Sequence, residues 1–377
     1  MKFGTKLIHN GNEIDKQTGA LSIPIYQAST YHQEDVDAQQ EFDYSRSGNP
    51  TRKALENTVA QLENGIRGFA FSSGMAATSS ALSIFSAGDH LIVCEDVYGG
   101  TYRITTNFFS RFHVEVSFVN ASDLKEIKSK IKSNTKAIFL ETPSNPLLKI
   151  TDLKGVVSIA KEHGLITLID NTFMSPYLQR PLDFGIDIVI HSATKFIGGH
   201  SDVLAGLIVV KDKDLAKRIY AVQNGFGAVL GPQDCWLLLR GLKTLKIRMD
   251  YQQKNAEKLV AFLNRHAKVE KVYYPGLPEH EGSAIHASQA DGAGCVLSFK
   301  ATDVETAKIF MKKVKLAAVA VSLGGVETIV SYPAKMSHAA MPKAERERLG
   351  ISDSLIRVSV GLEEIEDLIA DFENALS

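Results

Sequence analysis

Between residues 65 and 211 the chain alternates short apolar runs with longer amphipathic stretches. Each short run carries apolar side chains on both faces, which is typical of a strand buried on both sides. The runs predict strands at 68–71, 90–94, 115–119, 136–140, 165–169, 187–190 and 207–210. Helical patterns at 76–85, 124–132 and 153–163 lie between them. This alternation predicts an α/β fold with a mostly parallel seven-stranded sheet and helices on both faces.

After about residue 245 the pattern changes. A helix is predicted at 251–265, then strands at 269–274, 295–299, 317–323, 328–332 and 356–360, and a last helix at 363–376. This order predicts a smaller C-terminal α+β domain. The first 45 or so residues show no period, so we expect an irregular arm that must dock on other structure. The expected division is an arm at 1–46, a large domain at 47–246 and a C-terminal domain at 247–377.

Composition narrows the functional classes without choosing among them. The chain has 377 residues, 44% of them hydrophobic, and 42 Lys and Arg against 43 Asp and Glu. These proportions exclude a disordered chain, a collagen and a coiled coil. A net charge of −1 offers no attraction for nucleic acid or a membrane surface. We therefore expect an enzyme that acts on a small molecule.

Location and metal binding are also constrained. The longest apolar runs are far too short to span a bilayer, and residues 1–6 lack the apolar core of a signal peptide. Cys94, Cys235 and Cys295 lie far apart without a C-x-x-C pair. We therefore expect a cytoplasmic protein with free, buried thiols and neither a disulfide framework nor a metal site.

Residues that could bind a ligand or take part in a reaction follow three of the predicted strands. Asp170 comes directly after strand 165–169, and Ser192, Thr194 and Lys195 follow strand 187–190. Gly74 lies where strand 68–71 meets the next helix, whose first amides can bind an anion. Ligands of parallel sheets bind outside the carboxyl ends of the strands. Taken singly, each residue has an ordinary alternative: a helix cap, a solvated lysine or a common glycine turn.

Together these residues suit one ligand. Gly74 offers a phosphate site, Asp170 a buried carboxylate and Lys195 an amine for an electrophile, and the sequence here is neither a dinucleotide fingerprint nor a P-loop. Pyridoxal phosphate has a phosphate, a pyridine nitrogen and an aldehyde that match all three. Lys195 would form a Schiff base and later act as a base, for which its pKa must fall towards 7–8.

Eight segments extend this interpretation along the chain. They are 44–51, 96–101, 141–146, 170–172, 191–195, 198–202, 322–325 and 356–362. In this order they resemble the Cys/Met-metabolism family of pyridoxal-phosphate enzymes, which includes cystathionine β-lyase, cystathionine γ-lyase, cystathionine γ-synthase and methionine γ-lyase. The resemblance implies fold type I, the aspartate-aminotransferase-like fold. It also implies a homotetramer built from two catalytic dimers.

The resemblance implies a role for individual residues at the cofactor. Lys195 would carry the cofactor, Asp170 would pair with the pyridine nitrogen, and Tyr98 would stack on the ring and assist proton transfer. The cofactor set also includes the residues expected around the phosphate and beside Asp170: Gly74, Met75, Thr172, Ser192 and Thr194. Tyr44 and Arg46 would reach the phosphate from a neighbouring subunit, which gives the arm a function.

The resemblance also implies how a substrate is held. Arg357 would clamp the α-carboxylate, helped by Asn145 and Ser322. Arg103 and Asp43 stand where cystathionine-processing members place charges for the distal amino-acid group. A surface or inter-subunit ion pair is the alternative for these two residues.

The reaction itself stays open between elimination at the β- and the γ-carbon. Members that handle cystathionine at the γ-position usually carry an acid where this chain has Val321, whereas methionine γ-lyases usually carry Cys where it has Gly100. We therefore expect a cystathionine lyase with β-elimination slightly favoured, giving homocysteine, pyruvate and ammonia. Cystathionine γ-lyase is the first alternative, followed by methionine γ-lyase or cystathionine γ-synthase. A nicotinamide dehydrogenase or a non-catalytic protein on this fold is disfavoured.

Overall fold

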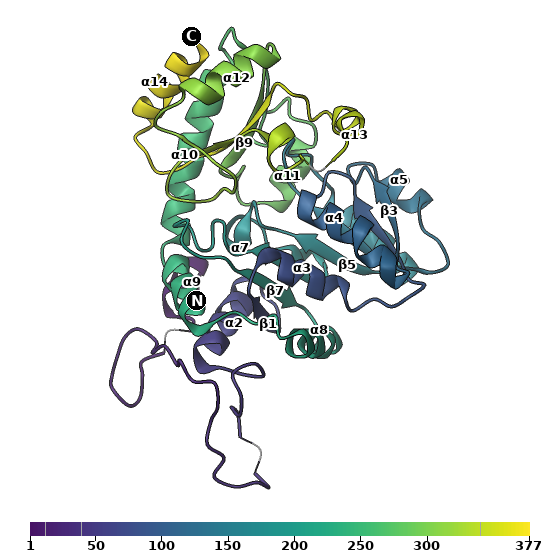
Figure 1. The fold of residues 1–377 in the computed structure, drawn as a ribbon, viewed down its shortest axis with the longest axis vertical. Coiled ribbons are helices and arrows are strands. Elements are labelled where there is room, and N and C mark those ends of the chain that lie inside the picture. Colours follow the sequence, from purple (N-terminus) through teal and green to yellow (C-terminus); the bar gives the residue numbers. More distant parts are fainter. Residues whose placement is uncertain (12, 39, 340) are drawn as a thin grey trace.

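The computed structural model describes residues 1–11, 13–38, 40–339 and 341–377. Figure 1 shows a large unit around one sheet, a second unit above it that ends at the C-terminus, and an N-terminal segment that extends away below. Within the described residues, no helix is long and apolar enough to cross a membrane.

The large unit is built on a seven-stranded sheet in the order β1-β7-β6-β5-β4-β2-β3. The strands are β1 (Arg67–Phe71), β2 (His90–Cys94), β3 (Glu115–Val119), β4 (Thr135–Glu141), β5 (Ile166–Asp170), β6 (Ile188–Ser192) and β7 (Gly206–Val210). Only β7 runs against its neighbours β6 and β1, so the other six strands share one direction. The predicted mostly parallel sheet is confirmed, with boundaries shifted by a residue or two.

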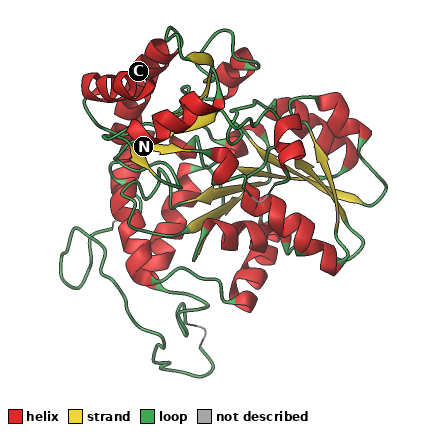
Figure 2. Cartoon of the chain, turned by 45° about the horizontal axis from the view of Figure 1, so that its top comes forward, coloured by secondary structure: helices red, strands yellow, loops and turns green. Residues whose placement is uncertain are grey.

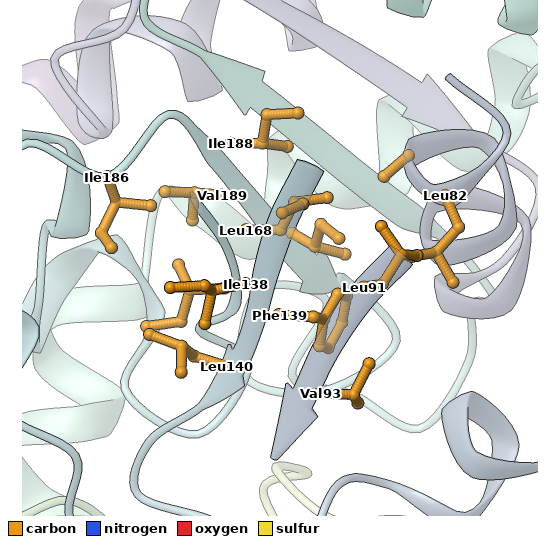
Figure 3. Packing of buried hydrophobic residues seen from close by; sticks show 14 of the residues in the cluster. Leu82, Leu91, Val93, Ile138, Phe139, Leu140, Leu168, Ile186, Ile188 and Val189 are labelled. Carbon is orange, nitrogen blue, oxygen red and sulfur yellow. The ribbon is translucent and has the colours of Figure 1, made fainter. Parts of the chain in front are cut away.

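Both faces of this sheet are buried, which explains its uninterrupted apolar runs. On β7, Ile208 and Val210 pack into one hydrophobic cluster, whereas Leu207 and Val209 pack into another. Figure 3 shows the first cluster, where side chains of several neighbouring strands and of helix α3 (Gly74–Leu82) meet. Burying each such side chain contributes about 1.5–3 kcal/mol, so the sheet forms a rigid platform for residues at its edges.

Helices cover the sheet on both sides. They are α2 (Pro50–Leu62), α3 (Gly74–Leu82), α4 (Gly99–Asn107), α5 (Leu124–Ser129), α6 (Leu153–His163), α7 (Ser175–Leu178), α8 (Lys213–Phe226) and α9 (Pro232–Leu242). The helix predicted from residue 76 begins earlier, at Gly74, because the Ser73 side chain caps it by accepting a hydrogen bond from the Ala76 amide at 3.0 Å. This shift brings Gly74 and Met75 into the first helical turn.

The C-terminal unit carries a second sheet in the order β10-β11-β12-β9-β8. Its strands are β8 (Val269–Tyr273), β9 (Val296–Ala301), β10 (Ala318–Val319), β11 (Ile329–Ser331) and β12 (Leu355–Ser359). Its helices are α10 (Leu245–Leu263), α11 (Ser283–Gln289), α12 (Val304–Lys313), α13 (Lys343–Arg348) and α14 (Ile365–Leu376). An α+β arrangement is thus present, as predicted.

Two predicted elements in this unit are wrong in extent. The strand expected at 317–323 covers only Ala318–Val319. It could not extend to residue 323, because Ser322 adopts a φ of +85° that a strand cannot continue through. The helix expected at 251–265 begins earlier, at Leu245, whose side chain is fully buried against the large unit.

The N-terminal segment differs from the expectation at its start. Helix α1 (Phe3–His9) forms there and buries Leu7 in the same cluster as Leu55 and Leu62 of α2, so the first residues are not irregular. Beyond it, the described residues before Asn49, which caps α2, form no helix. This segment extends away from the body in both Figure 1 and Figure 2. The predicted domain boundaries stay predictions.

Candidate active site

A cavity of about 400 Å³ lies where the carboxyl ends of the large sheet meet the C-terminal unit. It gathers thirteen of the residues predicted for cofactor and substrate: Gly74, Met75, Tyr98, Arg103, Asn145, Asp170, Thr172, Ser192, Thr194, Lys195, Val321, Ser322 and Arg357. These residues are separated by up to 283 positions in the sequence, so folding alone brings them together.

Asp170 is the last residue of β5 and lies largely buried in this cavity. Its Oδ1 accepts hydrogen bonds from the Thr172 amide at 3.0 Å and from the Thr172 hydroxyl. The same hydroxyl oxygen accepts from the Ser192 amide at 2.8 Å, which ties β5 to β6. Burial raises the pKa of Asp170, while the bonds from Thr172 and the charges of His191 and Lys195 oppose that rise. The carboxylate is therefore held in one orientation and able to partner a cation.

Lys195 follows β6 and donates from Nζ to the Ser322 hydroxyl oxygen at 2.6 Å. Burial, together with the positive charge of Arg357, lowers the pKa of Lys195 to about 8, although Asp170 acts in the opposite direction. A substantial fraction of the amine is therefore neutral near physiological pH. A neutral buried amine can attack a carbonyl and can accept a proton.

The segment at Ser322 crosses close to Lys195. A Cβ added at Gly324 would lie 2.6 Å from the Phe196 amide nitrogen, and Gly324 has a φ of +79°, so only glycine fits there. Ser322 has a φ of +85°, a strained conformation that costs on the order of 1–3 kcal/mol for a non-glycine residue. The surrounding structure holds this strain at the point where Ser322 meets the lysine.

Gly74 and Met75 form the first turn of α3, which faces the cavity. The Ser73 cap satisfies the Ala76 amide, whereas the amides at a helix start have no partner within the helix. A Cβ at Gly74 would lie 2.8 Å from the Cβ and Oγ of Ser192, so a side chain there would fill the cradle. The site thus offers amides and hydroxyls to an anion such as a phosphate.

Arg357 lies in β12 and is buried on the opposite wall. Its Nη1 donates to Asn145 Oδ1 at 2.9 Å, and its Nη2 donates to the Ser322 carbonyl at 2.6 Å. Among the described residues, its Nε has no hydrogen-bond partner. Burial lowers the pKa of Arg357 to about 10, so the guanidinium remains charged at neutral pH. A buried guanidinium with an unused donor suits a carboxylate supplied by a ligand.

Three predicted residues lie outside the cavity in this single chain. Tyr44 and Arg46 are exposed in the N-terminal segment, where the Arg46 guanidinium lies 5.6 Å from the Tyr44 ring centroid and donates to the Asn224 carbonyl at 2.7 Å. Asp43 accepts from the Tyr44 amide at 2.6 Å. Their roles at the cofactor or substrate therefore stay predictions.

The structure adds one acid to which the sequence reasoning assigned no role. Glu141 is the last residue of β4, lies beside Asp170 in the sheet register and lines the cavity. The rule that pointed to Asp170, an acid at the carboxyl end of a predicted strand, could have identified it too.

The three cysteines are free and buried, and burial raises the pKa of each thiol. Among the described residues, no group of three or more His, Cys, Asp or Glu side chains could hold a metal ion.

Comparison with known proteins agrees with this geometry. Residues 4–377 match the model of the family described as Cys/Met metabolism PLP-dependent enzyme. The chain is 58% identical over 372 residues to cystathionine β-lyase MetC of Bacillus subtilis, covering 99% of this chain and 95% of that protein. It is 49% identical over 376 residues to cystathionine γ-lyase of the same organism, covering 100% of this chain and 99% of that protein.

A solved structure has the same fold throughout. It is cystathionine γ-lyase from Lactobacillus plantarum complexed with L-serine, with a TM-score of 0.98 and 47% identity, covering 100% of this chain and 98% of that chain. The predicted resemblance and the fold type I architecture are therefore confirmed.

Proposed function

Since the chain belongs to the Cys/Met metabolism PLP-dependent enzyme family, we propose that it binds pyridoxal phosphate at Lys195 and cleaves cystathionine by β-elimination. The broader prediction, a carbon–sulfur lyase of a PLP-dependent family, is confirmed by its relatives. The observation that carries the proposal is the meeting of Lys195, Asp170 and Arg357 in one cavity.

The residues present fit pyridoxal phosphate. The start of α3 with Ser192 and Thr194 offers a phosphate cradle that a Cβ at Gly74 would fill. Asp170 supplies a buried carboxylate for the pyridine nitrogen, and Lys195 supplies an amine with a pKa of about 8 for the aldehyde. When bound, the cofactor withdraws electrons from the α-carbon of an amino acid.

The chain's own groups would then perform three tasks. Arg357 and Asn145 hold the α-carboxylate, which fixes the α-carbon in the cavity. Lys195 removes the α-proton, and its bond with the Ser322 hydroxyl orients the amine. In the elimination the bond between the β-carbon and sulfur breaks, and the thiolate leaves as homocysteine after taking up a proton. Water then releases the remaining three-carbon fragment as pyruvate and ammonia.

The choice between β- and γ-elimination concerns the distal part of the substrate. γ-Elimination needs a second proton removal, at the β-carbon, before the leaving group departs. Val321, which is 66% exposed and lines the cavity beside Ser322, offers no carboxylate that could accept this second proton. This observation favours β-elimination, and γ-elimination of cystathionine is the second candidate.

Product analysis tests the proposal directly. Purified enzyme supplied with pyridoxal phosphate and cystathionine is expected to release homocysteine and pyruvate in equal amounts. Cysteine and 2-oxobutyrate as the sole products would overturn β-elimination. Rapid methanethiol release from methionine, with cystathionine unreactive, would overturn both candidates.

Val321→Glu is expected to shift the product ratio towards cysteine and 2-oxobutyrate by about tenfold. This shift corresponds to about 1.4 kcal/mol, which lies within the range of about 1–4 kcal/mol for one charge interaction at 4 Å near a protein surface. Chromatographic measurement of both amino-acid products checks this expectation. Val319→Glu is the matched control because Val319 is also exposed but does not line the cavity. An unchanged ratio in Val321→Glu would remove this position as the determinant.

An apolar groove beside the cavity supports a catalytic dimer. The groove has a volume of about 920 Å³, shares Met75 and Arg103 with the cavity, and exposes Phe108, Phe112 and Phe226 at 49%, 54% and 68%. Apolar surface of this kind is typical of a subunit interface. A second copy would cover it and bring Tyr44 and Arg46 to the cavity, and two such dimers would form a tetramer. The cytoplasmic location expected from the sequence stays a prediction.

Mixing two inactive variants tests the shared site. Arg46→Ala is expected to lose at least about 100-fold in activity, because it removes a charged contact to the cofactor phosphate. Lys195→Ala is expected to lose more, because it removes the amine that would attack the aldehyde and act as the base. If Arg46 serves the partner, refolding the two variants together restores one intact site in half of the dimers, which is about one quarter of wild-type activity. No recovery on mixing, with stable dimers present, would contradict the shared site.

A further inference from the structure

Glu141 connects two parts of the cavity wall through one carboxylate. Its Oε2 accepts a hydrogen bond from the Tyr98 amide at 2.9 Å, and its Oε1 accepts from the Asn145 amide at 3.0 Å. Tyr98 precedes α4, whereas Asn145 lies in the loop after β4. The path of the chain alone therefore does not hold these two segments at a fixed position relative to each other. Both residues line the cavity.

The connection continues to the buried arginine. The side chain of Asn145 accepts from Arg357 Nη1 at 2.9 Å, so a chain of hydrogen bonds runs from Glu141 through Asn145 to the guanidinium. The charge of Glu141 also acts on Arg357 directly and favours its protonated form. Glu141 is thus connected, through Asn145, to the guanidinium that is proposed to bind the substrate carboxylate.

On the opposite side, Glu141 supports the wall formed by Tyr98. One edge of the Tyr98 ring lies close to Gly100, because a Cβ at Gly100 would lie 2.5 Å from a Tyr98 ring carbon and 2.6 Å from the Met75 sulfur. The amide bond to Glu141 sets the backbone from which this ring projects. A shift of that backbone would therefore change where the Tyr98 ring lies in the cavity wall.

Burying the Glu141 carboxylate costs free energy, and the packing around it does not explain why an acid is found at this position. Glu141 is 6% exposed and lies next to Asp170, and both burial and that second negative charge raise the pKa of Glu141 well above its ordinary value. The negative charges of Asp170 and Asp96 both oppose the charged form of Glu141, whereas buried acids usually lie beside a cation that favours it. A neutral glutamine would avoid the cost, but it could not accept from both amides.

We propose that Glu141 is a positioning residue. It holds the carboxylate-binding pair, Asn145 and Arg357, at a fixed position relative to the part of the cavity wall that Tyr98 forms. The proposal rests on the proposed function, since it assumes an amino-acid ligand whose carboxylate meets Arg357. The ligand class it governs is α-amino carboxylates, as distinct from simple amines.

Spectral titration of the loaded enzyme separates this role from general support. L-Alanine has a carboxylate but no leaving group, and ethylamine lacks the carboxylate, so both bind without elimination. In Glu141→Gln, the side-chain amide presents a donor to one of the two backbone amides. We expect the Kd for L-alanine to rise about tenfold, the Kd for ethylamine to change less than twofold, and the visible circular dichroism of the cofactor to change.

The matched control is Asp96→Asn. Asp96 is another buried acid nearby, but it accepts from the Ser144 hydroxyl and does not line the cavity. Its variant is expected to keep the wild-type Kd for both ligands. If Glu141→Gln does not fold, Glu141→Asp, which keeps both acceptor oxygens on a shorter stem, is expected to show a smaller rise for L-alanine alone.

The outcomes distinguish this inference from the proposed function. If Glu141→Gln changes the Kd for L-alanine and the Kd for ethylamine equally, or changes neither, the positioning role is overturned while the proposed function is left intact. A wild-type protein that takes up no pyridoxal phosphate would instead overturn the function, and the positioning role with it.

Discussion

Replacement of Lys195 by alanine is expected to lower kcat/KM for cystathionine by at least about 10⁴-fold. The variant loses the amine that would anchor the cofactor covalently and the base that would remove the α-proton, and a positioned base alone contributes about 10²–10⁴-fold. No other lysine lines the cavity among the described residues. Turnover of cystathionine, with pyruvate as the measured product, checks the expectation.

Two further measurements show that the loss is chemical. Borohydride reduction should attach the cofactor covalently to the wild-type chain but not to Lys195→Ala. The Tm of the apo variant should not fall. Folding lowers the pKa of Lys195 to about 8, so below that pH the charged lysine makes the folded state less stable, and the substitution removes this charge.

Lys149→Ala is the matched control for this variant. Lys149 is a partly buried lysine that pairs with Glu95 at 3.5 Å and lies outside the cavity. Its variant is expected to keep wild-type turnover. Retention of more than about one per cent of wild-type kcat/KM in Lys195→Ala would exclude Lys195 as the catalytic amine.

Asp170→Asn is expected to reduce kcat by about 10³-fold while leaving uptake of the cofactor largely intact. A carboxylate favours a protonated pyridine nitrogen and so keeps the ring electron-withdrawing, whereas a neutral amide does not. Breaking a buried charge pair costs about 3–5 kcal/mol, which corresponds to two to four decades in rate. The Asn side-chain oxygen can still accept the two bonds from Thr172, so the local fold is preserved.

Steady-state kinetics and the visible spectrum together test this variant. We expect kcat to fall much more than KM rises, because the pyridine partner acts on the reacting electrons and not on the substrate carboxylate. Asp96→Asn again serves as control, since it removes a nearby buried carboxylate that lies outside the cavity. A matching loss of activity in both variants would show that buried charge in general, rather than Asp170, is responsible.

The large sheet was the most predictable part of the fold. A strand buried on both faces must be apolar on both faces, and the seven runs of the large unit carry that pattern plainly. Helices α8 and α9 carry amphipathic patterns comparable to that of α6, so the sequence pattern could have predicted them as well. The two-residue β10 was overextended, because apolar residues continue past the point where Ser322 takes a positive φ to reach Lys195. Strand propensity depends on neighbouring residues in the sequence, so it cannot predict a conformation that a distant contact imposes.

Some residues of the candidate site could likewise be located from the sequence, and others could not. Asp170 and Lys195 could be found from their positions after predicted strands, because the carboxyl ends of parallel strands share one edge of the sheet. Arg357 gave no such signal, since it lies within β12 of the other unit, and only its motif pointed to it. Glu141 followed the same strand-end rule as Asp170 and was passed over, since its role depends on amides of Tyr98 and Asn145 that no pattern connects.

By itself, the sequence determined the α/β architecture and the family and pointed to the groups proposed to react, because each of these depends on local patterns or on ordered motifs. Only the tertiary structure decided how the groups act on one another. The pKa of Lys195 falls to about 8 because the fold buries it beside Arg357, 162 positions away in the chain. Electrostatic interaction depends on distance in space and on burial, and neither quantity is carried by the order of residues.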